Sequence, residues 1–210
     1  MSSSTTESDL LFDQIKGLGT AEALETGSEL ELQGGVLLIE SGSLRSLSAL
    51  PPNQQWRTVQ RHQAGELVGW LDWLHQRPIE VLRAAEPTRL WRLPAGEVVE
   101  LWENTPELRE FCARQTPAIE AVHLLQQLSH ADQQRAKQLE QWKKLLPELN
   151  WLVDTDPTPA DLTRPGQWFR PDGTPWDQPS DQAIPQQRLI WLPDPEQQRQ
   201  QALVKTEMGQ

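Results

Sequence analysis

The stretch GELVGWLDWLHQRPIEVLRA, residues 65–84, decides the fold that we expect for this chain of 210 residues. It opens with Gly65 and Gly69, continues through a short apolar turn, and ends in a segment with the pattern of a strand. A glycine-containing loop that leads into a short helix can hold an anion, because free backbone N–H groups converge there. What the loop binds then depends on the side chains around it.

Composition limits the classes of partner. The chain has 30 Asp and Glu against 19 Lys and Arg, a formal net charge of −11, whereas nucleic acids and anionic membrane surfaces require a basic footprint. Cys112 is the single cysteine, so no disulfide forms within one chain. The first residues lack the basic and apolar regions of a secretory signal. No run of about 18 apolar residues occurs. We therefore expect a cytoplasmic protein without nucleic-acid binding or membrane insertion.

Short strands separated by glycine or proline breaks flank the opening stretch on both sides. Strands at such short spacing predict an antiparallel sheet. In the strand expected upstream of the glycine loop, strict alternation places Arg57 and Arg61 on one face and Trp56 on the other. The expected strands are residues 36–39, 43–47, 56–61, 79–82 and 88–93.

Helical patterns surround these strands. Ser8 or Asp9 could cap a helix that extends to Lys16, and shorter helices are expected over 97–102 and 106–112. Apolar residues at helical spacing then predict one long helix over 117–146, with Pro117 at its start.

Residues 154–195 differ in character, because they contain nine of the 17 prolines. Trp168, Phe169 and Trp176 lie in the same segment. A disordered segment rarely contains so many large apolar side chains. We therefore expect an extended segment that docks on the preceding domain or on a partner.

The order of these elements resembles the cyclic-nucleotide-binding domain family. The local matches are VLLIESGSLRSL (36–47), QAGELVGWLDWL (63–74) and EVLRAAEPTRLWRLPAGEVVELWENTPEL (80–108). The resemblance covers about residues 8–146 and implies an α+β fold. This fold is an antiparallel β-roll, or jelly-roll barrel, with flanking helices and a long C-terminal helix over residues 1–153. A proline-rich extended tail or linker follows over 154–210.

The resemblance also implies where the ligand residues of that family fall. In the family, backbone N–H groups at the start of a short helix bind the phosphate. A Glu next to a glycine holds the ribose hydroxyl, and an Arg pairs with the cyclic phosphate. Counted from Gly65 and Gly69, the Glu position holds Trp70; counted back from Arg83, the Arg position holds Pro78.

Two other registers stay open, in which Glu66 takes the ribose role or Arg77 takes the phosphate role. Each lost charge-assisted hydrogen bond costs about 1.5–3 kcal/mol, and about 1.4 kcal/mol is a factor of ten in affinity. We therefore expect a degenerate phosphate cassette in which Trp70 and Trp73 fill the space of the nucleotide. Cyclic nucleotide is then an unlikely ligand, and no cofactor is expected.

The stretch has a more particular similarity to the N-terminal domains of cyanobacterial type I secretion ABC transporters that carry a peptidase. There Gly-Trp replaces Gly-Glu, and Pro-x-Glu replaces the Arg segment, as at Pro78 and Glu80 here. The segments WFRPDGTPW and QRLIWLPDP resemble the linker that follows that domain. Because the chain stops at Gln210 without peptidase, membrane or ATPase segments, we expect a free-standing relative or the leading part of a longer chain.

The resemblance predicts a non-catalytic regulatory or interaction module associated with an ABC-type export system. Its expected partner is a transporter protein or a second copy bound through the long helix. A functional receptor for cyclic AMP or cyclic GMP is the main alternative. A transcription regulator would need a basic helix-turn-helix, which residues 154–195 do not supply.

Candidate catalytic and metal-binding side chains are sparse. The four histidines are scattered and form no H-x-H pair, which disfavours a metal-dependent enzyme of cupin type. Cys112 has no His or Asp near it in sequence to activate it as a nucleophile. Glu66, Asp72 and Glu80 are expected to be solvated residues at strand edges.

Overall fold

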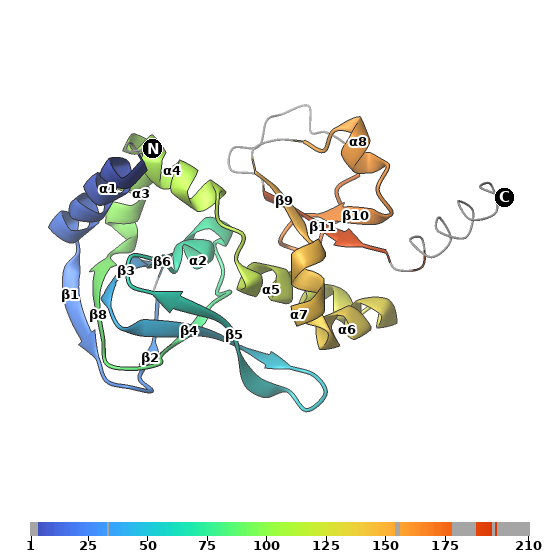
Figure 1. The fold of residues 1–210 in the computed structure, drawn as a ribbon, viewed down its shortest axis with the longest axis horizontal. Helices are drawn as coiled ribbons and strands as arrows, with labels where there is room; N and C mark the ends of the chain where they lie inside the picture. The colour runs from blue at the N-terminus through green and yellow to red at the C-terminus, as the bar shows by residue number, and fades with distance from the viewer. Residues whose placement is uncertain (1–3, 33, 154–155, 178–187, 195, 197–210) are drawn as a thin grey trace. The chain divides into compact units, whose positions relative to one another are not determined.

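The computed structural model describes residues 4–32, 34–153, 156–177, 188–194 and 196 (Figure 1). The chain divides into two compact units, Met1–Glu120 and Ala121–Gln210, and helix α5 (Ala118–Ser129) crosses the boundary. This boundary differs from the one expected after residue 153. The reason is that β9 (Asn150–Val153) pairs with β11 (Arg188–Pro193), which lies in the segment expected to be a separate tail.

The first unit contains two four-stranded antiparallel sheets, with the orders β1-β8-β3-β6 and β2-β7-β4-β5. The expected α+β class, with antiparallel sheets and flanking helices, is confirmed. The strands are β1 (Thr20–Leu24), β2 (Glu29–Leu30), β3 (Val36–Ser41), β4 (Ser43–Leu50), β5 (Gln55–Gln63), β6 (Leu67–Val68), β7 (Val81–Ala84) and β8 (Thr88–Leu93).

The core of the first unit consists of leucine-rich side chains from both sheets. Leu37 on β3 and Leu90 on β8 pack in one cluster with Leu44 on β4 and Leu82 on β7, and all four are buried. Because alternate residues of a strand point to opposite faces, one face of each sheet supplies this core. The opposite face of the β2-β7-β4-β5 sheet does not contribute to this core cluster.

Helices α1 (Ser4–Leu18), α2 (Trp70–His75), α3 (Ala95–Asn104) and α4 (Pro106–Ala113) complete the first unit. The helices expected over 97–102 and 106–112 are confirmed as α3 and α4. The first helix begins at Ser4, earlier than the expected cap at Ser8 or Asp9. Leu11 and Ile15 on α1 are buried, and Phe12 packs edge-on against Phe111 of α4.

Strand β5 departs from the predicted alternation because it contains a β-bulge. Ser46 of β4 pairs with Gln60, but the next residue, Leu47, pairs with Thr58. Val59 is therefore an extra residue, and an extra residue reverses which face the rest of the strand presents. As a result Arg61 shares a face with Trp56 rather than with Arg57, contrary to the sequence-based prediction.

The second unit begins within α5, at Ala121, and continues through α6 (Gln133–Glu140), α7 (Trp142–Leu145) and a 3-10 turn (Leu146–Glu148). The single long helix expected over 117–146 is therefore wrong. The chain leaves the helix after Ser129, and the Asp132 side chain accepts a hydrogen bond of 2.8 Å from the Gln134 N–H. A side-chain cap of this kind starts a new helix.

The proline-rich segment forms part of a three-stranded antiparallel sheet, with the order β10-β11-β9. Between β9 and β11 lie α8 (Pro159–Leu162) and β10 (Gly166–Phe169). Trp168, Trp176, Leu189 and Trp191 form a buried cluster, so this segment builds a small core of its own. Its docking on the preceding domain or on a partner stays a prediction. Among the helices that the structure describes, none is long and apolar enough to cross a bilayer.

Candidate functional site

The two glycines flank β6, with Gly65 between β5 and β6 and Gly69 between β6 and α2, and both have left-handed backbone angles. The φ angle is +86° at Gly65 and +85° at Gly69, a region that side chains disfavour. A Cβ atom on Gly69 would lie 2.7 Å from the Gly35 carbonyl oxygen and 2.8 Å from Leu32 Cδ2, whereas Gly65 has open space. Gly69 is thus required both by its backbone angle and by close packing.

The carboxylate of Glu80 occupies the backbone cradle at the start of α2. Its Oε2 accepts a hydrogen bond of 2.7 Å from the Gly69 N–H, and its Oε1 lies 3.4 Å from the Ser46 hydroxyl. Burial raises the pKa of Glu80 to about 7, although the nearby His62 and the Gly69 hydrogen bond act in the opposite direction. An internal acid therefore stands where this loop would receive an external anion.

Asp72, in the first turn of α2, fixes the backbone that carries Glu80. Its Oδ1 accepts hydrogen bonds from the Ile79 N–H at 2.7 Å and from the Glu80 N–H at 2.9 Å. Burial raises the pKa of Asp72, and the two backbone hydrogen bonds oppose that rise. The helix and the strand that follows it are thereby joined, which directs the Glu80 side chain back toward Gly69.

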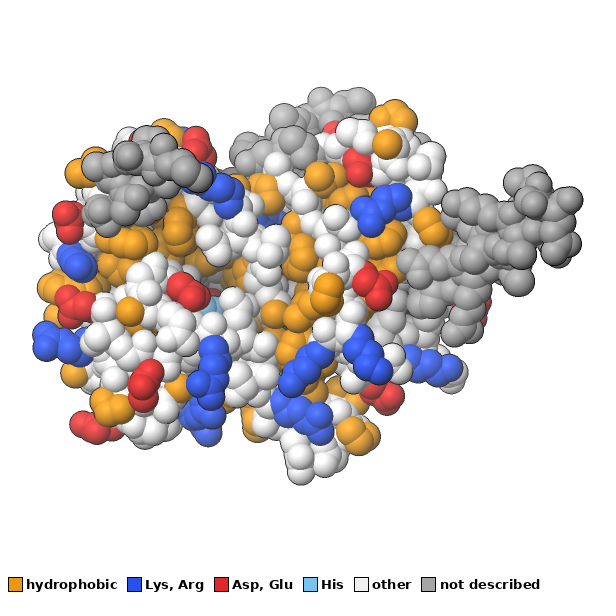
Figure 2. Space-filling model, viewed as in Figure 1, with side chains coloured by type: hydrophobic (Ala, Val, Ile, Leu, Met, Phe, Trp, Pro, Cys, Tyr) orange, Lys and Arg blue, Asp and Glu red, His pale blue; other side chains and the backbone are white. Residues whose placement is uncertain are grey.

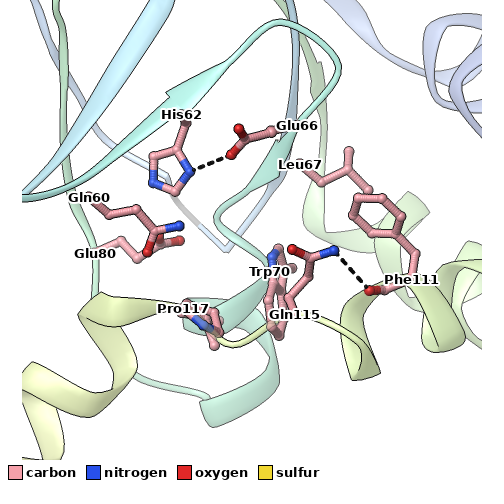
Figure 3. Close-up of a pocket in the computed structure, with 10 residues that line it drawn as sticks. Gln60, His62, Glu66, Leu67, Trp70, Glu80, Phe111, Gln115 and Pro117 are labelled. Atoms are coloured by element: carbon pink, nitrogen blue, oxygen red, sulfur yellow. Dashed lines mark hydrogen bonds and ion pairs between the residues drawn. The ribbon is translucent and has the colours of Figure 1, made fainter. Parts of the chain in front are cut away.

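His62 on β5 connects Glu80 to the glycine loop. Its Nε2 lies 2.7 Å from the Ser46 hydroxyl oxygen, and its Nδ1 lies 3.1 Å from Glu66 Oε2, as Figure 3 shows for the latter pair. The hydrogen bond with His62 lowers the pKa of Glu66. Four side chains, from β4, β5, the glycine loop and the segment before β7, thus form one polar network.

Hydrogen-bond chemistry limits where the protons of this network lie. An ionised Glu66 only accepts hydrogen bonds, so His62 Nδ1 donates to it. The Ser46 hydroxyl has a single hydrogen, so it can donate to Glu80 Oε1 or to His62 Nε2 but not to both. The Ser46 hydroxyl therefore links His62 and Glu80 in one hydrogen-bonded chain.

A serine, a histidine and a glutamate joined in this order also resemble a nucleophile with its general base. Ser46, however, has no exposed surface, and its hydroxyl lies within reach of His62 and Glu80. A substrate carbonyl cannot approach the serine oxygen. The geometry therefore supports a buried hydrogen-bonded network rather than nucleophilic catalysis.

A cavity of about 20 Å³ adjoins the network (Figure 3). Such a volume accommodates about one water molecule, whereas pockets for small ligands span about 300–1,000 Å³. Within the described parts of the chain, no group of three His, Cys, Asp or Glu side chains could hold a metal ion. The lining includes His62, Glu66, Trp70, Glu80, Phe111 and Gln115.

The structure brings only some of the predicted site residues to this cavity. Glu66 and the buried Trp70 line it, and Gly69 lies beside Trp70 in the chain. Trp73 instead packs against Trp102 of α3, with ring centroids 4.6 Å apart, so it does not fill the cavity as expected. Arg77, which is half-buried, and Pro78, which is exposed, are not among its lining residues.

Arg83 lies on the outer face of β7 and pairs with Glu29 of β2. The cavity is on the other side of that sheet, so Arg83 is not a part of the cassette. Gly65 retains the loop conformation but is not among the lining residues.

Three residues of the network, Ser46, His62 and Glu80, were not expected to lie together from the sequence. Glu80 was expected at a solvated strand edge, but it is 7% exposed. Strand alternation could have predicted that Glu80 is buried, because residues 80, 82 and 84 point to the same face of the strand and Leu82 and Ala84 are buried. Ser46 and His62 meet only through the pairing of β4 with β5, for which the sequence carries no local signal.

Comparison with known proteins identifies no family by sequence: no protein-family model and no curated protein matches the chain. Several solved structures are similar in fold. A cyclic-nucleotide-binding domain from Methylobacillus flagellatus is 22% identical, with a TM-score of 0.40, over 63% of this chain and 68% of that one. A transcriptional regulator from Thermotoga maritima is 12% identical, with a TM-score of 0.42, over 65% of this chain and 92% of that one.

The c-di-GMP-responsive global regulator of Xanthomonas campestris is 16% identical, with a TM-score of 0.43, over 63% of this chain and 61% of that one. At TM-scores below 0.5, none of these likenesses carries an argument about what this chain binds. The functional argument depends on the geometry of the site.

Proposed function

We propose that the first unit is a non-catalytic regulatory or interaction module, similar to a cyclic-nucleotide-binding domain but with a phosphate cassette closed by its own side chains. The observation that carries this proposal is the hydrogen bond of 2.7 Å from the Gly69 N–H to Glu80. Trp70 is buried beside it, and the adjoining cavity is about 20 Å³. A nucleotide would have to displace both side chains, and its phosphate would meet a carboxylate.

A contact between the cavity wall and helix α5 supports a regulatory role. Gln60 lines the cavity, and its Oε1 accepts a hydrogen bond of 2.9 Å from the Ala118 N–H. Ala118 is the first residue of α5, the helix that continues into the second unit. A change at the site can therefore reach the start of that helix through one side chain.

The proposed partner is a component of an ABC-type export system. This part of the proposal is supported by the resemblance of residues 65–84, with Trp70 and Pro78 at the altered positions, and by the resemblance of the segments around Trp168 and Trp191 to the linker in such transporters. Genes for an exporter or its processing peptidase beside this one would support it. Their consistent absence from the neighbourhood would contradict it.

A functional cyclic nucleotide receptor is the second candidate, and one observation favours it. Glu66 lines the cavity, and it is the residue that one open register assigns to the ribose hydroxyl. Its carboxylate is already hydrogen-bonded to His62, however. The two candidates differ in whether this glutamate is available to a ligand.

Titration calorimetry with cyclic AMP and cyclic GMP separates the two candidates. A closed cassette predicts no saturable heat for either nucleotide at concentrations up to about 100 µM, an affinity that corresponds to about 5–6 kcal/mol. Glu66→Gln serves as the paired variant. Saturable binding by the wild type that is weakened in this variant would establish the receptor and refute the closed cassette.

A further inference from the structure

The outer face of the β2-β7-β4-β5 sheet carries three arginines in one row. Strand pairing places Arg83 opposite Arg45, and Arg45 opposite Arg61. Side chains directly opposite on antiparallel strands have Cβ atoms about 4.5–5.5 Å apart, so the three guanidinium stems start within about 11 Å of one another. Figure 2 shows Lys and Arg side chains gathered over the region where Figure 1 places β4 and β5.

Charge in this arginine row is poorly balanced. Glu29, opposite Arg83, forms the ion pair at one end of the row. In the described ranges of the chain, neither Arg45 nor Arg61 has an ion pair, and the buried Nε atoms of Arg45 and Arg83 donate no hydrogen bond. Like charges placed directly opposite each other destabilise a sheet. The row is therefore unfavourable in the free protein and would gain from an anion.

Apolar side chains lie on the same face beside the arginine row. The neighbouring row places Val81 and Thr58 on either side of Leu47, and the row after it pairs Ala49 with Trp56. Trp56 is 61% exposed and Val81 is 37% exposed. Trp and Arg are the residue types that most often dominate the energy of protein interfaces.

The β-bulge at Val59 creates this combination. In a regular strand Arg61 would share a face with Arg57, and Trp56 would point the other way. The extra residue instead brings Arg61 and Trp56 to the same face. The arginine row and the exposed tryptophan thus result from one local feature of β5.

We propose that this face binds an acidic segment of a partner protein, with carboxylates on Arg45 and Arg61 and an apolar side chain on Trp56. This inference rests on the proposed function of the unit as an interaction module and specifies the chemistry of its partner. Arginine binds carboxylate through two parallel hydrogen bonds. A nucleic acid fits less well, because the chain has a net charge of −11 and repels a long polyanion outside this small surface.

The binding test uses fluorescence anisotropy of a labelled peptide of repeated Glu-Glu-Leu units, with a Gln-Gln-Leu peptide as the uncharged control. The full chain should bind the acidic peptide saturably, and binding should weaken at high salt. Arg45→Gln and Arg61→Gln should each weaken binding about tenfold or more, since each removes a charge-assisted hydrogen-bonded pair. Arg57→Gln, on the opposite face of the same strand, should change affinity by less than about twofold.

Trp56→Ala supplies a second readout that does not depend on charge. This substitution should weaken binding of the Glu-Glu-Leu peptide. Thermal unfolding should show that the Trp56→Ala variant and the arginine variants remain folded. Absence of saturable binding, equal loss in the Arg57→Gln variant, or equally tight binding of a single-stranded oligonucleotide would each overturn the proposal. These outcomes are independent of calorimetry with cyclic nucleotides, which tests the closed cassette alone.

Discussion

Replacing Glu80 by Gln should remove a pH dependence of stability that the wild-type protein has between about pH 5 and pH 8. Burial raises the pKa of Glu80 from 4.5 to about 7 in the folded protein. Between these two values the folded chain holds a proton that the unfolded chain has released. The contribution to stability is therefore complete below about pH 4.5, and it is lost as the pH rises toward about 7.

The size of this effect follows from the difference between the folded pKa of about 7 and the ordinary value of 4.5. One unit corresponds to 1.36 kcal/mol, so wild-type stability should fall by roughly 3 kcal/mol across the window relative to the variant. A glutamine in this position still has an oxygen that can accept the hydrogen bond from the Gly69 N–H. It carries no charge that burial would penalise. Glu80→Gln should therefore be more stable than the wild type at about pH 8.

Urea unfolding followed by tryptophan fluorescence, at several values between about pH 5 and pH 8, measures the two free energies of unfolding. Glu100→Gln is the matched control, because Glu100 is exposed on α3 and the change is chemically the same. The free energy of unfolding of this control should depend on pH in the same way as that of the wild type. If Glu80→Gln also ran parallel to the wild type, the carboxylate would be ionised in the folded protein throughout this range, and the reasoning would be refuted.

Four further substitutions test the packing around the site and the cap of helix α6. Gly69→Ala should cost about 1–3 kcal/mol from backbone strain alone, and more from the contact with the Gly35 oxygen, whereas Gly65→Ala should show only the strain; equal losses in urea unfolding would contradict the packing argument. Trp70→Ala should lower the free energy of unfolding by about 3–5 kcal/mol through loss of a buried ring, and a loss below about 1 kcal/mol would mean that the ring is not packed as described. Asp132→Ala should cost about 0.5–2 kcal/mol and reduce the helical circular dichroism of the second unit; an unchanged spectrum and stability would speak against the cap.

Local sequence signals predicted much of the first unit. The segment from Val36 to Leu47 has an apolar run, a break at Gly42 and a second apolar run, and it forms β3 and β4 as expected. Pro106 at the start of a helical pattern likewise predicted a helix, and that helix is α4. These elements were predictable because glycine, proline and apolar spacing act within a few residues of where they occur.

Features that depend on distant parts of the chain were not predictable. The bulge at Val59 is defined by the register of β5 against β4, and the helix break before Asp132 interrupts an apolar spacing that continues on both sides. The pairing of β9 with β11 joins residues that lie more than thirty positions apart, such as Val153 and Arg188. Composition alone therefore described the proline-rich segment as extended, whereas part of it forms a sheet.

At the candidate site the resemblance pointed to Trp70 at the altered glutamate position, and the structure places that residue at the cavity. The resemblance did not reveal which group occupies the anion cradle. Glu80 does so because Asp72 turns the backbone before β7, a contact between residues eight positions apart that no periodic pattern encodes.

The hydrogen-bonded network also limits how the site could respond to pH. Whether Glu80 is ionised or protonated, one of its oxygens can still accept the hydrogen bond from Gly69, because protonation of a carboxyl leaves an acceptor oxygen. A change of pH therefore shifts stability without vacating the cradle. The arginine row on the outer face of the same sheet, which we propose as the surface for an acidic partner segment, therefore lies apart from the cradle and does not depend on the ionisation of Glu80.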